Sequence, residues 1–131
     1  MRLVTREIKS AVYDLISVVA TTYERGHVDD AALPYAVYAL GNSVEGLVDN
    51  EDAIRYTLDI DVCDHDKSKD TTVVENLADS IDTALNRVHH LGDGFYMFFV
   101  RQSRNPNYPT PDEFTFRRNL RYELRVYEEA D

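Results

Sequence analysis

The stretch from Ile54 to Val62 constrains the fold more than any other part of this sequence. Its side chains alternate between apolar and polar without interruption, which is typical of a β-strand with one buried face. A polar segment follows at residues 64–70, and apolar residues then recur at helical spacing over residues 72–88. These features predict a strand, a polar corner and an amphipathic helix that bury their apolar sides together.

The remaining secondary structure follows from similar patterns. We predict a first helix over about residues 5–23, further strands at residues 33–40, 95–100 and 114–126, and long loops at residues 41–52 and 104–113. The chain is then a single α+β domain over residues 1–131 with the element order α-β-β-α-β-β. We expect a mainly antiparallel sheet with two helices packed on one face.

The acidic balance of the chain limits its partners. A formal net charge of −10 at pH 7 argues against binding to nucleic acid or to an anionic membrane, because both need clustered Lys and Arg. Residues 1–7 lack the pattern of a signal peptide, and no apolar run approaches the ~18–20 residues of a membrane span. The single cysteine, Cys63, excludes an internal disulfide. We therefore expect a cytosolic protein without a membrane segment.

The polar sides of two predicted strands carry opposite charges. In the strand at residues 54–62 and just beyond it, these positions are Arg55, Thr57, Asp59, Asp61 and Cys63. In the last strand they are Arg117, Asn119, Arg121, Glu123 and Arg125. If the strands are neighbours in the sheet, or meet across subunits, each opposed pair contributes roughly 0.2–1 kcal/mol.

Residues 64–75 place oxygen ligands at the positions used by a calcium-binding loop, but the match fails at its strictest point. Position 6 of such a loop needs glycine for a sharp turn, and in this chain it is Lys69. The segment is better explained as a solvated corner that ends in a helix cap. No metal site is predicted in it.

Two further groups of residues superficially suggest catalysis or metal binding. Asp61, Cys63 and His65 share one side of a strand, but side chains two residues apart start about 6.5–7 Å from each other, too far for direct proton transfer. His89 and His90 are expected at a helix C-terminus, where adjacent side chains diverge and cannot easily bind one metal. The sequence therefore predicts no catalytic residue, no cofactor and no enzymatic activity.

The last third of the chain is its basic part. Aromatic residues lie among its arginines, so a platform for nucleic acid is conceivable. The arginines are Arg101, Arg104, Arg117, Arg118, Arg121 and Arg125, and the aromatic residues are Tyr96, Tyr108, Phe114, Phe116 and Tyr122. Because the chain as a whole repels phosphate, a charged sheet face or a site for an acidic protein is the better interpretation.

Four stretches in order carry a resemblance to a known family. Residues 33–38 show an aliphatic-Pro-x-x-x-Tyr pattern, and residues 74–86 read aliphatic-x-x-Leu-Ala-Asp-x-Ile-x-x-Ala-Leu. Residues 56–64 and 120–127 match the central and closing strands. Over nearly its whole length the chain resembles the tail terminator proteins of long-tailed bacteriophages, also called tail completion or tail-to-head joining proteins.

The resemblance implies a structural role in a virion. Such proteins form a hexameric ring on the head-proximal end of the tail tube, stop tube growth and join the tail to the head. The implied partners are other copies of the chain, the major tail tube protein and a head-completion or neck protein, while genomic DNA passes through the ring without being read. The implied location is the tail or neck of the virion, and the host cytoplasm during assembly.

Surface contacts rather than a pocket are then expected to carry the function. In the two long loops we expect Leu47, Val48, Asp49 and Tyr108 to contact the tube or the neck. On the two charged strands, Asp59, Asp61, Arg117, Arg121 and Arg125 are candidates for contacts between subunits. The alternatives are another neck or head-completion component, or a regulatory α+β domain that binds a small molecule in a concave pocket.

Overall fold

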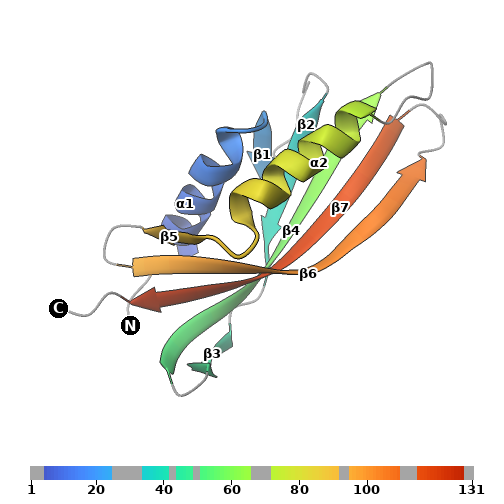
Figure 1. The fold of residues 1–131 in the computed structure, drawn as a ribbon. Coiled ribbons are helices and arrows are strands. Elements are labelled where there is room, and N and C mark those ends of the chain that lie inside the picture. The colour runs from blue at the N-terminus through green and yellow to red at the C-terminus, as the bar shows by residue number, and fades with distance from the viewer. Residues whose placement is uncertain are drawn as a thin grey trace.

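A computed structural model describes residues 5–24, 34–41, 44–48, 51–65, 72–91, 95–109 and 115–128 (Figure 1). The helices are α1 (Thr5–Ser17) and α2 (Thr72–Leu85). The strands are β1 (Thr22–Glu24), β2 (Tyr35–Leu40), β3 (Val44–Val48), β4 (Glu51–His65), β5 (His89–Leu91), β6 (Phe95–Pro109) and β7 (Thr115–Glu128).

One sheet of seven strands organises the molecule. Its order is β1-β2-β4-β7-β6-β5, with β3 paired to β4 off this path. The pair β1–β2 is parallel, and the other neighbouring strands are antiparallel. Both helices lie on the same side of the sheet (Figure 1). The predicted α+β class, the mainly antiparallel sheet and the placement of the helices are confirmed; the short strands β1, β3 and β5 were not predicted.

The core lies between the helices and one face of the sheet, as the alternating pattern of residues 54–62 predicts. Every second side chain of the central strands is buried against the helices because the side-chain period of a strand is two residues. On this face, the buried apolar positions of β4 and β7 are Tyr56, Leu58, Ile60, Val62, Leu120, Tyr122, Leu124 and Val126. The helices contribute Ile8, Val12, Ile16, Val74, Ala78, Ile81 and Leu85.

The prediction of a long loop at residues 41–52 is wrong for residues 44–48 and 51–52, which belong to β3 and β4, while residues 42–43 and 49–50 lie outside the described residues. Leu40 pairs with Leu58 and Val44 pairs with Arg55, so the register with β4 shifts by one residue between β2 and β3. Gly in a strand often marks such an irregularity or a close backbone approach. The Gly41 N–H donates to Thr57 O at 2.6 Å, and a Cβ at Gly41 would lie 3.2 Å from that oxygen. The glycine therefore marks a close backbone approach to β4.

The predicted loop at residues 104–113 is wrong for residues 104–109, which belong to β6. The pairing of β6 with β7 shifts register twice, between Arg101 and Ser103 and between Asn105 and Tyr108. Pro106 falls within the second shift, where a residue without an N–H is tolerated because the ladder is already interrupted. Residues 110–113 lie outside the described residues.

Both helices end earlier than predicted. α1 ends at Ser17 and α2 at Leu85, and each is followed by a short edge strand. His89 and His90 therefore lie in β5, not at a helix C-terminus as predicted. Arg87, two residues after the end of α2, has a φ of 60°, in the left-handed region that commonly follows the last turn of a helix. Over only a few residues, the apolar spacing of a strand cannot be told from that of a helix. This explains why both helices were predicted to extend past their true ends.

Candidate assembly surface

One face of the sheet carries no helix, and we call it the open face. Register with β4 and β7 places on this face the residues that alternate with the core positions. They include Tyr35, Val37, Ala39, Arg55, Thr57, Asp59, Asp61, Cys63, Tyr96, Phe98, Val100, Arg117, Asn119, Arg121, Glu123, Arg125 and Tyr127. Within the described ranges, no helix packs on this face (Figure 1). The open face is therefore where a sheet of this kind can meet a partner.

The opposite charges predicted on two strands meet within one chain, because β4 and β7 are neighbours. Asp59 pairs with Arg121 in register, and the Arg121 Nε donates to Asp59 Oδ1 at 3.0 Å. This hydrogen bond raises the pKa of Arg121. The Asn119 amide donates to Asp61 Oδ1 at 2.9 Å. The structure thus shows Asp59, Asp61 and Arg121 in side-chain pairs between neighbouring strands of one sheet.

Cys63 is buried on the open face beside Tyr35 and Arg117. Burial raises the pKa of the Cys63 thiol, and the Arg117 charge and the hydrogen bond with Tyr35 only partly oppose this. A raised pKa leaves little thiolate at neutral pH, whereas a catalytic cysteine needs a lowered pKa. His65 continues the same strand, but its side chain lies outside the described residues. This geometry fits a structural cysteine.

The other predicted contact residues fall in strands or outside the described part of the chain. Leu47 and Val48 belong to β3, and Tyr108 belongs to β6, so none of the three lies in a loop. Asp49 and most of the calcium-like segment, residues 66–71, lie outside the described residues. In the described ranges, no group of His, Cys, Asp and Glu could hold a metal ion. Nor is any helix there long and apolar enough to span a membrane.

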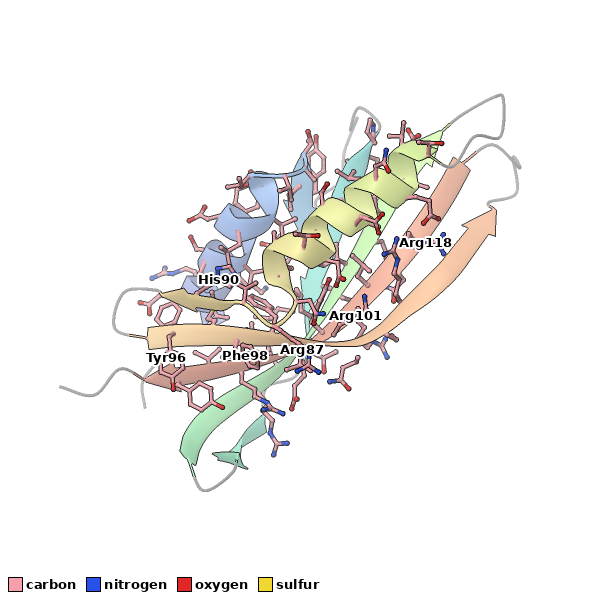
Figure 2. All side chains as sticks on the ribbon, viewed as in Figure 1. Arg87, His90, Tyr96, Phe98, Arg101 and Arg118 are labelled. Atoms are coloured by element: carbon pink, nitrogen blue, oxygen red, sulfur yellow. The ribbon has the colours of Figure 1, made fainter. Side chains whose placement is uncertain are left out.

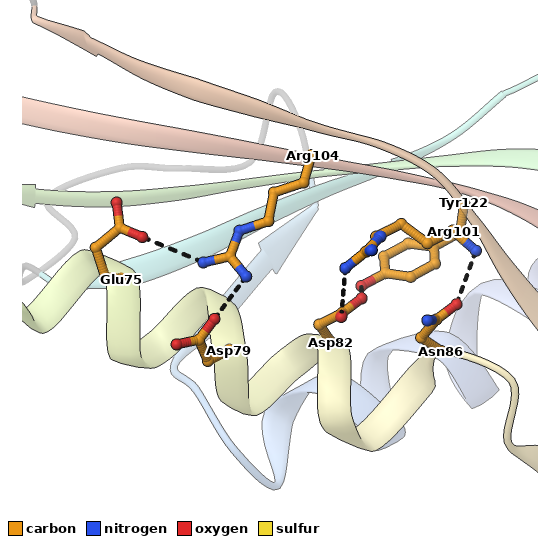
Figure 3. A network of polar contacts seen from close by, with 7 residues as sticks. All are labelled: Glu75, Asp79, Asp82, Asn86, Arg101, Arg104 and Tyr122. Atoms are coloured by element: carbon orange, nitrogen blue, oxygen red, sulfur yellow. Dashed lines mark hydrogen bonds and ion pairs between the residues drawn. The ribbon is translucent and has the colours of Figure 1, made fainter.

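A polar ladder that the sequence reasoning missed joins α2 to β6 and β7 (Figure 3). On the helix side, its members are Glu75, Asp79 and Asp82 of α2 and Asn86, which directly follows α2. On the strand side, its members are Arg101, Arg104, Arg118 and Tyr122. The helix members are spaced four, three and four residues apart, which puts them on one side of a helix. That spacing was the signal available in the sequence.

The contacts of the ladder are short, and half of its members contact two others. Arg104 contacts Asp79 at 2.5 Å and Glu75 at 3.2 Å, and Glu75 also pairs with the largely buried Arg118. Arg118 interrupts the apolar side of the last strand, and its position toward α2 explains that interruption (Figure 2). These arginines are thus neutralised by the helix, so a large part of the basic third of the chain serves internal packing.

The register shift in β6 lets two arginines of the ladder face the same helix. Arg101 pairs with Tyr122, and Arg104 pairs with Leu120. The side chains of Tyr122 and Leu120 are buried on the side of the sheet that faces α2. In a regular strand, residues three positions apart lie on opposite faces. The extra residue, Gln102, restores Arg104 to the helix side, because a bulge re-aims the side chains that follow it.

The buried hydroxyl of Tyr122 makes the ladder sensitive to high pH. Burial, and then the 2.7 Å hydrogen bond to Asp82, raise the pKa of Tyr122 far above its usual value of 10.0. The unfolded tyrosine loses its proton near pH 10 while the folded one keeps it, so its stabilising effect is complete below pH 10 and falls as pH rises. We expect the free energy of unfolding to fall by about 1.4 kcal/mol per pH unit from this residue.

The measurement is urea unfolding of the protein and of Tyr122→Phe between pH 8 and 11. Burial also raises the pKa values of Tyr35 and Tyr38, and both tyrosines remain in the variant. The difference between the two proteins therefore isolates Tyr122. Parallel pH profiles for the two proteins would contradict the prediction.

Comparison with known proteins gives a likeness in structure alone. No protein-family model matches the chain, and no curated protein matches it in sequence. A chain of the solved structure titled "Virion of native gene transfer agent (GTA) particle" has the same fold, with a TM-score of 0.73 and 12% sequence identity. The match covers 96% of this chain and 98% of that chain. The two proteins therefore share their fold from end to end.

Proposed function

We propose that this chain is a structural protein of a virion, and that it acts as a tail terminator. The observation that carries the proposal is the whole-chain likeness to a chain of a gene transfer agent virion. The four sequence stretches that resemble tail terminators support the finer assignment. The strands and the helix to which these stretches belong form the centre of the sheet and the ladder.

The proposed arrangement is a hexameric ring on the head-proximal end of the tail tube. A closed ring needs two different contact surfaces on each subunit. The open face is proposed as one of these surfaces, while the end of the hairpin formed by β3 and β4, which bends away from the helix side of the sheet, is proposed to face the tube or the neck protein (Figure 1). Leu47, Val48, Asp49 and Tyr108 are proposed for contacts with the tube or the neck protein.

On the open face, the proposed roles of the charged residues differ. Asp59, Asp61 and Arg121 hold β4 and β7 together, and this keeps the face rigid for a neighbouring subunit. Arg117 and Arg125 are proposed to contact that neighbour directly. Genomic DNA would pass through the ring without being read, because an acidic chain repels phosphate.

The test is to mix the purified protein with polymerised tube protein from the same particle. We expect electron microscopy to show a ring at one end of each tube, and tube growth from that end to stop. A variant lacking residues 46–49 shortens the end of the hairpin and is expected to lose this capping. Binding to head particles but not to tubes would instead identify a neck or head-completion component, and binding to neither would refute a connector role.

A further inference from the structure

The first part of β6 is a segment that could pair with copies of itself. Residues Phe95–Val100 read Phe-Tyr-Met-Phe-Phe-Val, without a charge, a proline or a glycine. Segments with this composition have a high β-propensity and form cross-β aggregates when their backbone is accessible. One edge of β6 pairs with β7. The opposite edge, which we call the outer edge, therefore decides whether a strand of another copy can be added.

A short segment after α2, residues 86–91, lies along the outer edge of this stretch, and we call it the covering segment. Its β5 part pairs with the beginning of β6 (Figure 1). Next to β5, the Arg87 N–H donates to Phe99 O at 2.8 Å. Farther along, Asn86 Oδ1 accepts a hydrogen bond from the Arg101 N–H at 2.9 Å (Figure 3). The covering segment therefore bonds to the outer edge along nearly all of the uncharged stretch.

The rest of the outer edge is interrupted rather than covered. The register of β6 with β7 shifts twice after Arg101, and bulges break the regular row of donors and acceptors that an added strand needs. Pro106 and Pro109 also belong to this part of β6, and neither has an N–H to donate. Among the described strands, only β5 lies on the outer edge. The edge is thus regular mainly where the covering segment lies on it.

We propose that the covering segment prevents β6 of one copy from pairing with β6 of another. When the segment is displaced, two uncharged stretches can pair edge to edge and then stack into cross-β aggregates. Arg87 is the residue that directs the segment onto the edge, because its φ of 60° turns the chain after α2. The covering segment acts in each copy of the chain, with or without a ring, so this role goes beyond the proposed function.

Two substitutions of Arg87 test the proposal. Arg87→Pro removes the N–H that bonds to Phe99 and excludes the φ of 60°, since the ring of proline fixes φ near −65°. Arg87→Gly loses the same exposed side chain but keeps the N–H and adopts a positive φ readily. For Arg87→Pro we expect amide hydrogen exchange in residues 97–101 and thioflavin-positive aggregation to become at least about tenfold faster. Arg87→Gly is expected to match the unaltered protein in both measurements.

A second substitution separates aggregation through β6 from aggregation of a chain that is merely less stable. Phe98→Glu places a charge in the uncharged stretch, opposite Arg125 on the open face, and such a charge opposes stacking. In the Arg87→Pro background, Phe98→Glu is expected to return aggregation to the rate of the unaltered protein. Val18→Glu adds the same charge at a position that is 84% exposed and outside the sheet, and it is expected to leave the fast aggregation unchanged.

The inference is wrong if Arg87→Pro leaves either the hydrogen exchange or the aggregation rate unchanged. It is also wrong if Phe98→Glu and Val18→Glu affect aggregation equally, because aggregation would then not depend on β6. None of these measurements involves the tail tube. Their failure would therefore leave the proposed function intact, and a failure of tube capping would leave the role of the covering segment intact.

Discussion

Replacing Asp82 by alanine is expected to lower the free energy of unfolding by about 2–4 kcal/mol. The Asp82 carboxylate accepts a hydrogen bond from the Tyr122 hydroxyl at 2.7 Å and one from Arg101 Nη1 at 2.8 Å. Tyr122 is fully buried, so the variant leaves its hydroxyl without this acceptor in the core. Arg101 is 40% exposed and can turn to water, so most of the loss comes from Tyr122.

Chemical denaturation of the purified protein measures this loss, and the same helix supplies a control. Asp79 is 60% exposed and pairs with Arg104 near the surface, where an ion pair contributes only about 0–1 kcal/mol. Asp79→Ala is therefore expected to change stability little. Equal losses for Asp79→Ala and Asp82→Ala would mean that the ladder acts only through surface charge, and that the buried Tyr122 hydroxyl does not depend on its acceptor.

The fold class could be predicted because a few segments have strong and unambiguous periodicity. The alternation around Leu58 and Ile60 fixes one buried face of a strand, and the stripe that includes Ala78 and Ile81 fixes the buried side of a helix. Each pattern extends over several residues, because burying apolar surface is favourable at every position on the buried side. A helix or strand with one apolar side must bury that side against another element. The prediction of an α+β arrangement follows from this.

The extent of the strands could not be predicted from the same signals. Gly41 and the acidic residues near the hairpin end are typical of loops, yet β2 and β3 both pair with β4 here, with a register shift of one residue between them. Pro106 similarly suggested a loop within β6. Turn-forming residues indicate that regular pairing is interrupted, but they do not tell a one-residue bulge from a change of direction, because that depends on the partner strand.

The candidate site was only partly accessible from the sequence for a related reason. The charges of Asp59 and Arg121 were correctly expected to oppose each other, but the sequence left open whether they meet within a chain or between chains. The register of β4 and β7 decides for pairing within the chain. It also reveals what no single strand shows, namely that Arg55 and Arg125 are opposed and share one carboxylate.

Replacing Phe99 by alanine is expected to lower the free energy of unfolding by about 3–5 kcal/mol, the usual cost of removing a buried aromatic ring. Phe99 is fully buried in the middle of β6, opposite Leu124. Its ring contacts Tyr122 and His90 edge to face, at centroid distances of 6.3 and 5.6 Å. Its carbonyl accepts a hydrogen bond from the Arg87 N–H at 2.8 Å. The residue thus joins β5, β7 and the end of α2.

The neighbouring position gives a matched control for the Phe99 prediction. Phe98 has the same side chain on the same strand but faces the other way, opposite Arg125 on the open face, where it is half-buried. Phe98→Ala removes less buried area and is expected to cost well under half as much. Thermal and denaturant unfolding of both variants measures the difference. Comparable losses in the free energy of unfolding for the two variants would mean that side chains on both faces of β6 are equally buried. This would indicate that the open face is covered by packing in the folded chain.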